Sequence, residues 1–202
     1  MQKLSKRLEH FKTGIFASLT LKRNELLAQN KKVYNLYVGT PDFEPNEDIR
    51  NAVIEAAKNP ENFKYSLIDS VEMLTAVKEY YKNRYKVDIE VDEIASVNGS
   101  QDGIGHLGLA LLDVGDLVLL PDPGYPVFEA GAFLAGGEVV YYPLKKENNF
   151  LPDLSEFTEE TLKKVKYMIV SYPSNPCGAV ANKEMYVKLI ECAKEIRLLH
   201  YQ

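Results

Sequence analysis

The chain has 202 residues, of which 46% are hydrophobic and 26% charged, a balance typical of a soluble globular protein rather than a disordered one. The formal net charge of −5 argues against a nucleic-acid-binding protein, and no apolar run approaches the roughly 20 residues that span a bilayer. Cys177 and Cys192 are too few for a disulfide framework or a structural zinc site, so no metal is expected. The N-terminus is charged and has no apolar segment typical of a secretory signal, so we expect a cytoplasmic protein.

Two capped helices are predicted in the first half of the chain, over residues 46–58 and 70–84. Asn46 and Ser70 stand at capping positions, and apolar residues follow them at helical spacing. Beyond these helices, short apolar runs alternate with helical patterns. The predicted strands are 94–98, 117–120, 138–142 and 167–171, and the predicted helices are 101–112, 127–135, 155–163 and 183–195.

This alternation predicts an α/β protein with a mostly parallel sheet between two layers of helices, a three-layer α/β/α arrangement. The strands are short and wholly apolar, which favours burial on both faces. Ligands in such sheets bind beyond the carboxyl ends of the strands. We therefore expect a site formed by residues 98–102, 122–126 and 172–178, each of which follows a predicted strand.

The first of these segments joins a predicted strand to the start of a helix. The N–H groups and the dipole of a helix N-terminus attract anions. Gly99 permits close approach of a ligand to the backbone, and Ser100 adds a hydroxyl donor. The segment therefore predicts a phosphate site, and a capped helix with a glycine turn is the simpler alternative.

A glycine pattern nearby matches the G-x-G-x-x-G motif of dinucleotide-binding folds, with Gly103, Gly105 and Gly108 as its glycines. The pattern lies inside the predicted helix instead of at the strand end, and no acid stands at the ribose-binding spacing. We interpret these glycines as positions of close packing between helix and sheet. His106, within the pattern, is interpreted as a packed or surface side chain.

Proline-rich loops follow two of the later strands. Residues 121–126 hold Tyr125 at a strand end, where its ring can stack on a flat ligand or simply pack. Residues 172–178 carry Asn175 between prolines, and the bond from Asn175 to Pro176 is a candidate cis peptide. Asn175 is therefore a candidate for a specific hydrogen bond to a ligand.

Two further positions stand in or near these loops. Cys177 has no visible histidine partner, so we do not expect it to act as a nucleophile. Gly39 lies in an early loop with two prolines, residues 38–45, and indicates close approach of the backbone to another group.

Five motifs in these loops stand in one order along the chain: Gly39-x-Pro41-Asp42, Tyr65, Asn98-Gly99-Ser100-Gln101, Pro121-x-Pro123-x-Tyr125 and Ser174-Asn175-Pro176-x-Gly178. Together they resemble the fold-type-I aminotransferases of class I/II, which depend on pyridoxal 5'-phosphate (PLP), and most of all the LL-diaminopimelate and aspartate branch. The resemblance implies an enzyme of amino acid biosynthesis that transfers an amino group between an amino acid and a 2-oxo acid. It also implies that residues 1–45 form an N-terminal arm and small-domain segment, and residues 46–202 an incomplete PLP-binding large domain.

The resemblance gives each motif a role in holding the cofactor or the substrate. The helix N-terminus holds the cofactor phosphate, an aromatic ring stacks on the pyridine ring, and an asparagine binds the phenolic oxygen of that ring. A tyrosine reaches the phosphate bound by the partner subunit, which implies a homodimer. The implied cofactor-binding residues are Tyr65, Gly99, Ser100, Gln101, Tyr125 and Asn175, and Gly39 is implied to lie against the substrate carboxylate.

The family's Schiff-base lysine, the aspartate for the pyridine nitrogen and the distal arginine have no counterpart in this sequence, so the resemblance implies no catalytic residue here. Relatives run to about twice this length, and we expect the chain alone to be inactive. Lys183 is interpreted as the start of a solvated helix. Residues 196–202 do not resemble the family's next strand, and suitable codons allow the hypothesis of a single-base insertion after Glu195.

Three classes of function remain open at this point. The first is an aminotransferase-family large-domain fragment. The second is a non-catalytic binding module that pairs with an intact homologue. The third is a nucleotide-binding oxidoreductase, which rests on the glycine pattern alone. Whether the purified protein retains PLP or NAD distinguishes these classes.

Overall fold

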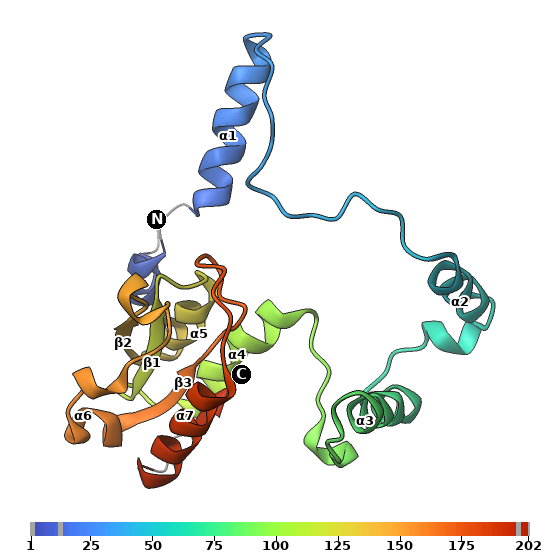
Figure 1. Ribbon diagram of the computed structural model, residues 1–202. Coiled ribbons are helices and arrows are strands. Elements are labelled where there is room, and N and C mark those ends of the chain that lie inside the picture. The colour runs from blue at the N-terminus through green and yellow to red at the C-terminus, as the bar shows by residue number, and fades with distance from the viewer. Residues whose placement is uncertain (1–2, 12–13, 197–198, 202) are drawn as a thin grey trace. The chain divides into compact units, whose positions relative to one another are not determined.

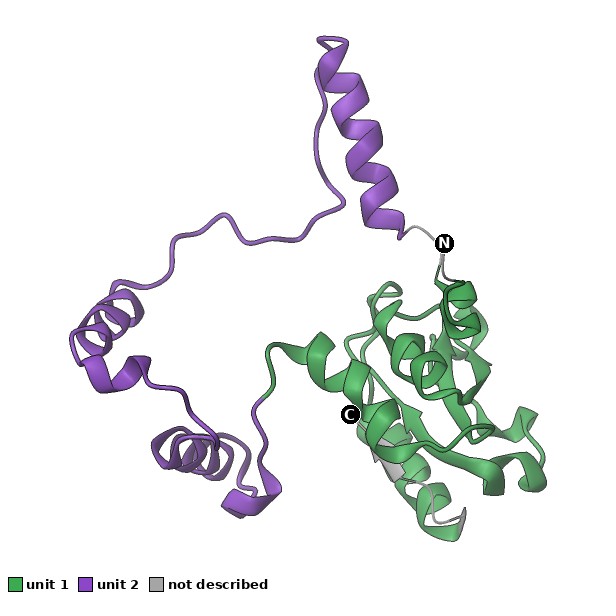
Figure 2. Cartoon of the chain, turned by 180° about the vertical axis from the view of Figure 1, so that it is seen from behind, with its two compact units in different colours: residues 1–12, 97–202 green, residues 13–96 purple. Residues whose placement is uncertain are grey.

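The computed structural model describes residues 3–11, 14–196 and 199–201 of the chain. It divides into two compact units (Figure 2). Unit 1 comprises residues 1–12 and 97–202, and unit 2 comprises residues 13–96.

Unit 1 alternates helices and strands along the chain (Figure 1). Its strands are β1 (Leu117–Asp122), β2 (Glu138–Pro143), β3 (Val165–Ile169) and β4 (Leu199–Tyr201). Its helices are α4 (Ser100–Leu111), α5 (Val127–Ala135), α6 (Glu159–Lys164) and α7 (Lys183–Ile196). The predicted α/β class is confirmed.

The four strands form one sheet in the order β2-β1-β3-β4, and all three neighbouring pairs are parallel. In the register, Val118 of β1 lies opposite Val139 of β2 and Tyr167 of β3. Because parallel strands run in one direction, their carboxyl ends lie along one edge of the sheet. That edge is where the site was predicted.

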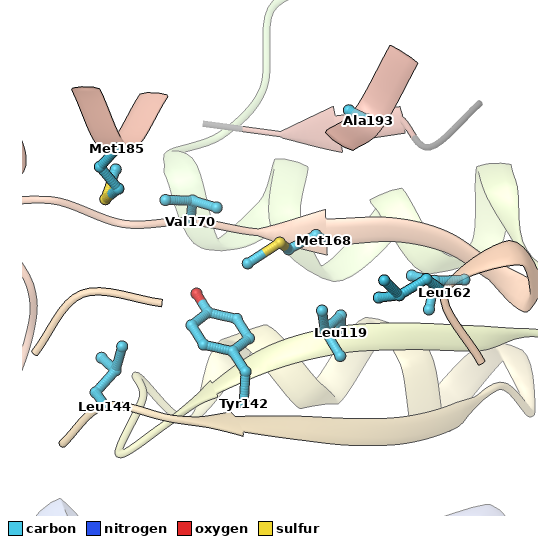
Figure 3. Packing of buried hydrophobic residues seen from close by; sticks show 9 residues of the cluster. Leu119, Tyr142, Leu144, Leu162, Met168, Val170, Met185 and Ala193 are labelled. Carbon is cyan, nitrogen blue, oxygen red and sulfur yellow. The ribbon is translucent and has the colours of Figure 1, made fainter. Parts of the chain in front are cut away.

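Helices cover both faces of this sheet. Val118 and Leu120 of β1 pack with Phe128 of α5 on one face, where Ile104 and Leu107 of α4 join them. On the other face, side chains of α6 and α7 pack against the alternate strand positions (Figure 3). The central residues of that second cluster are Leu119, Tyr142, Leu162, Met168, Met185 and Ala193. The three-layer arrangement is confirmed, and each fully buried aliphatic side chain contributes roughly 1.5–3 kcal/mol of transfer free energy.

A buried tyrosine links two strands of the sheet on this second face. The Tyr142 side chain is 1% exposed, and its hydroxyl donates a 2.7 Å hydrogen bond to the carbonyl oxygen of Ile169. Burial raises the pKa of Tyr142. The hydrogen bond satisfies the one polar atom of a large side chain that otherwise packs among Leu119, Leu144 and Met168.

The first residues of the chain also belong to unit 1. A 3₁₀ turn, Lys6–His10, packs on α5 through the ring of His10. That ring stacks on Phe133 with 4.1 Å between centroids and 9° between planes. The segment therefore packs against an element that follows the whole of unit 2 in the sequence.

The glycines of the G-x-G-x-x-G pattern bring α4 against α5. A Cβ atom at Gly108 would lie 2.2 Å from the carbonyl oxygen of Gly131, and one at Gly131 would lie 2.7 Å from that of Gly105. The predicted contact between helix and sheet is therefore wrong for Gly108, because the backbones that meet there are those of two helices. The His106 side chain is 71% exposed, so of the two interpretations given for it, packed or surface, it is a surface side chain.

Unit 2 contains α1 (Ile15–Ala28), α2 (Glu47–Ala57) and α3 (Val71–Tyr85). The predicted caps are present: the Asn46 side chain accepts a hydrogen bond from Asp48 N, and Ser70 Oγ accepts one from Met73 N. None of the described residues of unit 2 is buried. Unit 2 therefore has no apolar core of its own among these residues.

Two predicted elements differ from the structure in unit 1 and at its border. Residues 94–98 form no strand, because no neighbouring strand hydrogen-bonds to them in the described structure, and the chain bends at residue 98. The predicted helix 155–163 is instead a 3₁₀ turn, Leu154–Glu156, followed by α6. The break lies where Thr158 starts the helix anew, with its side chain accepting a hydrogen bond from Thr161 N.

The chain ends differ as well. Helix α1 was not predicted, because its apolar side chains, such as Ile15, Phe16 and Leu21, do not form one stripe. Among residues 196–202, for which no family-like strand was expected, Leu199–Tyr201 forms β4 parallel to β3. Residues 197, 198 and 202 lie outside the described part of the chain.

Replacing Gly108 with alanine tests the contact between α4 and α5. We expect Gly108→Ala to lower the free energy of unfolding by about 1–3 kcal/mol, because the new methyl group meets backbone atoms. Gly105→Ala is the matched control in the same helix, since a Cβ there has open space. It should raise the free energy of unfolding by about 0.5–1 kcal/mol. Urea unfolding followed by circular dichroism measures both, and changes of the same sign would contradict the contact.

Candidate functional site

A hollow opens at the carboxyl edge of the sheet in unit 1. Its volume is about 240 Å³. The N-terminus of α4, the start of α5 and the end of β3 border it, through Ser100, Ile104, Phe128, Ile169, Val170, Ser171 and Tyr172. Segments from three separate parts of the sequence thus meet where the strand-end rule places a ligand.

The N-terminus of α4 supplies donors to this hollow. Gly99 has φ +87° and ψ 157°, a backbone conformation that is essentially restricted to glycine, and the helix begins at the next residue, Ser100. Asp102 stabilises the turn, because its carboxylate accepts a 3.0 Å hydrogen bond from Asn98 N. Asp102 also lies 2.9 Å from His106 Nδ1 and does not line the hollow, so Ser100 is the polar residue of α4 among those that line it.

The loop after β1 holds an aromatic ring next to α4. A Cβ at Gly124 would lie 2.5 Å from the carbonyl oxygen of Pro121, so the chain turns tightly just before Tyr125. The Tyr125 hydroxyl accepts a 2.9 Å hydrogen bond from Gln101 Nε2. Its ring meets Phe128 edge to face, with 6.1 Å between centroids.

Tyr125 lines a second hollow, of about 260 Å³, instead of the first. Phe128 lines both hollows. Tyr141 and Glu129 also line the second hollow, and the Tyr141 hydroxyl donates a 2.6 Å hydrogen bond to Glu129. Burial, together with this carboxylate, raises the pKa of Tyr141 to about 12. The residues that line the second hollow therefore include both aromatic and acidic ones, Asp122 among the latter.

The loop after β3 contains the predicted cis bond. The Asn175–Pro176 peptide is cis, as predicted, and two backbone hydrogen bonds close the loop: Ser174 N donates to Ala179 O and Gly178 N donates to Ser174 O. Asn175 is exposed and is not among the residues that line either hollow. Its ligand role stays a prediction.

Gly39 and Tyr65 belong to unit 2, whereas the other sequence-predicted site residues belong to unit 1. The Tyr65 side chain is 89% exposed. The roles of Gly39 and Tyr65 stay predictions.

Sequence reasoning did not single out Ser171 and Phe128, and it noted Tyr172 only as part of a segment. The Tyr172 hydroxyl donates a 2.6 Å hydrogen bond to Phe150 O, and burial raises the pKa of this tyrosine to about 12. Ser171 and Tyr172 come directly after a buried strand. The rule that ligands bind at strand ends would have included Ser171 if the predicted site segment had begun at residue 171 instead of 172.

Neither hollow is lined by a lysine. Lys183 is exposed at the start of α7, as predicted. Within the described part of the chain, no group of three His, Cys, Asp or Glu side chains is arranged to hold a metal ion. In the same residues, no helix combines the length and the apolar character needed to cross a membrane.

The family model for aminotransferase class I and II matches residues 31–200. The chain belongs to the class I and II aminotransferases. It is 42% identical to the LL-diaminopimelate aminotransferase of Aquifex aeolicus over 201 residues, covering 98% of this chain and 52% of that protein. The protein of the same name from Dehalococcoides mccartyi is 38% identical over 198 residues, with 97% and 51% covered. The chain thus spans about half the length of the curated relatives it matches.

Solved structures agree with this family. Substrate-bound BacF from Bacillus subtilis superposes with a TM-score of 0.91 at 32% identity, covering 99% of this chain and 51% of that one. Alanine aminotransferase from Pyrococcus furiosus gives 0.89 at 27% identity, with 98% and 51% covered. The fold of this chain is therefore that of the corresponding part of an aminotransferase.

Members of this family use PLP, a flat ring that carries a phosphate. The residues present fit both parts of that molecule. Ser100 is a hydroxyl residue at a helix N-terminus and lines a hollow at the strand ends, which suits a phosphate. Tyr125, hydrogen-bonded to Gln101, lines the second hollow, which shares Phe128 with the first and suits an aromatic ring.

Replacing Gly99 with alanine tests the backbone of the turn before α4. A Cβ at this position has open space, so only the positive φ opposes the side chain. We expect Gly99→Ala to lower the free energy of unfolding by about 1–3 kcal/mol. Gly105→Ala, which has equally open space on a helical backbone, is the control in urea unfolding. A Gly99→Ala variant as stable as the wild type would contradict the described turn.

Proposed function

We propose that this chain forms the cofactor-binding part of a PLP-dependent aminotransferase that exchanges an amino group between an amino acid and a 2-oxo acid. One observation carries the proposal: Ser100 at the N-terminus of α4 lines a hollow at the carboxyl edge of the sheet, and the next residue, Gln101, is hydrogen-bonded to Tyr125. The names of the two curated relatives support LL-diaminopimelate as the amino donor, and with it a role in amino acid biosynthesis in the cytoplasm.

Each candidate residue has a role that its chemistry permits. Ser100 and the N–H groups that follow Gly99 would hold the phosphate, because a helix N-terminus carries partial positive charge. Gln101, the next residue of α4, is a further candidate for cofactor binding. Tyr125 would lie against the pyridine ring, and Asn175 would donate a hydrogen bond to its phenolic oxygen. When bound, PLP supplies a conjugated ring that withdraws electrons from the substrate Cα.

The roles of Gly39 and Tyr65 involve a second subunit in this proposal. Gly39 would contact the substrate carboxylate. Tyr65, which is 89% exposed, would donate to the phosphate bound by the partner in a homodimer. An exposed phenol on a unit whose described residues are all unburied supports a contact with another chain.

We further propose that these residues bind PLP without catalysing transfer on their own. A lysine amine is the group that would take the proton from the substrate Cα and return it, and no lysine lines either hollow. Binding and proton transfer are thus separate in this chain. A second candidate function is that of a non-catalytic partner for an intact homologous subunit. Two observations favour it: no lysine lines either hollow, and Tyr65 is exposed.

The first test measures PLP affinity by equilibrium dialysis. We expect reversible binding by the wild type and affinity about 10–100-fold weaker in Ser100→Ala, which removes a hydroxyl donor to a charged phosphate. Pyridoxal, which lacks the phosphate, should bind both proteins equally. Ser155→Ala, whose hydroxyl bonds to Asp153 outside both hollows, is the matched control. Equal PLP affinity in wild type and Ser100→Ala would contradict the proposed phosphate site.

The second test looks for catalysis and for a reactive lysine. We expect no transfer from LL-diaminopimelate to 2-oxoglutarate, and borohydride treatment of the PLP-saturated chain should label no single lysine in the mass spectrum. The intact Aquifex aeolicus relative is the positive control. Turnover with one specifically labelled lysine would overturn the proposed inactivity. Stable co-purification of the chain with that intact relative would favour the partner role.

A further inference from the structure

The hydrogen bond from Gln101 to Tyr125 joins two elements that are far apart in sequence. Gln101 is the second residue of α4, and Tyr125 ends the tight turn that precedes α5. The bond spans 2.9 Å between Nε2 and the phenolic oxygen. It is the contact by which the proposed phosphate-binding turn holds the proposed ring-binding residue.

Three contacts constrain Tyr125 in the described structure. The backbone carbonyl oxygen of Tyr125 accepts a 3.0 Å hydrogen bond from Phe128 N, which fixes the backbone. The edge-to-face contact with Phe128 limits the ring on one side. Gln101 holds the hydroxyl end of the ring. Loss of the Gln101 amide would leave the plane of the ring free to rotate away from its position.

We propose that Gln101 is a positioning residue that acts through Tyr125, and not a direct ligand of the cofactor phosphate. This inference rests on the proposed PLP site. It assigns the phosphate to Ser100 and the backbone of the α4 turn, and it assigns to Gln101 the orientation of the aromatic surface. The two roles differ in what they recognise, because a phosphate ligand discriminates PLP from pyridoxal and a ring-positioning residue does not.

A double-mutant cycle separates the two roles. The variants are Gln101→Leu, Tyr125→Phe and the pair, and the probes are PLP and pyridoxal in equilibrium dialysis. We expect each single variant to weaken both probes by about 2–10-fold, the range for one neutral hydrogen bond, and the pair to be no weaker than either single. Gln29→Leu, an exposed glutamine at the end of α1, is the matched control and should change neither affinity.

Two further measurements do not depend on the phosphate. Gln101→Glu keeps a partner for the phenol, because the carboxylate accepts a hydrogen bond from the Tyr125 hydroxyl, so it should retain wild-type affinity for pyridoxal. In the ligand-free protein labelled with ¹³Cζ-tyrosine, the Tyr125 signal, assigned with Tyr125→Phe, should shift in Gln101→Leu and stay in place in Gln29→Leu.

Specific outcomes overturn the inference. Loss of PLP affinity with unchanged pyridoxal affinity in Gln101→Leu would make Gln101 a phosphate ligand. Additive losses in the pair, or an unshifted Tyr125 signal, would show that the two side chains act independently. Each of these results leaves the proposed function standing. A wild-type chain that binds neither probe would overturn the proposed function, and this inference with it.

Discussion

The close contact between α4 and α5 is the constraint on which the site depends. Helix α4 carries Ser100 and Gln101 at its N-terminus, and α5 follows directly from the turn that carries Tyr125. Gly108 and Gly131 let the two backbones touch, so the two helices have little freedom to slide. The spacing between the proposed phosphate-binding turn and the Tyr125 ring is therefore set by packing away from the proposed site. A sequence pattern that resembles a nucleotide-binding motif has this structural role instead.

The sequence was sufficient to predict the elements that have a local signal, either a continuous apolar run or a capping residue. The continuous apolar runs of β1 and β3 indicated burial on both faces, and Asn46 and Ser70 indicated where two helices begin. Residues 94–98 show the limit of this reasoning, because a strand exists only where another strand hydrogen-bonds to it. Helix α1 shows the opposite limit, since a helix without one apolar stripe gives no periodic signal.

The site divides in the same way. The rule that parallel strands end at one edge predicted Ser100, Gln101 and Tyr125 in one site. The structure joins Gln101 to Tyr125 by a hydrogen bond, although residues 94–98 before α4 form no strand in the described structure. The partner of Gln101 could not be predicted, because a hydrogen bond between side chains depends on their rotamers and not on sequence spacing. Gly39 and Tyr65 lie in unit 2, where nothing in their local sequence specifies what they contact. The proposed separation of binding from chemistry has a related origin, since a hollow can be shaped by packing while proton transfer needs one particular amine.

The stacking of His10 on Phe133 makes unit 1 discontinuous, with unit 2 inserted between two parts of one packed body. The entropy of closing such a loop grows only with the logarithm of its length, and doubling the length costs about 0.6 kcal/mol. Unit 1 is thus nearly indifferent to how many residues the insertion contains. Residues 13–96 form a segment whose length can change during evolution, or by engineering, with little thermodynamic effect on the sheet of unit 1.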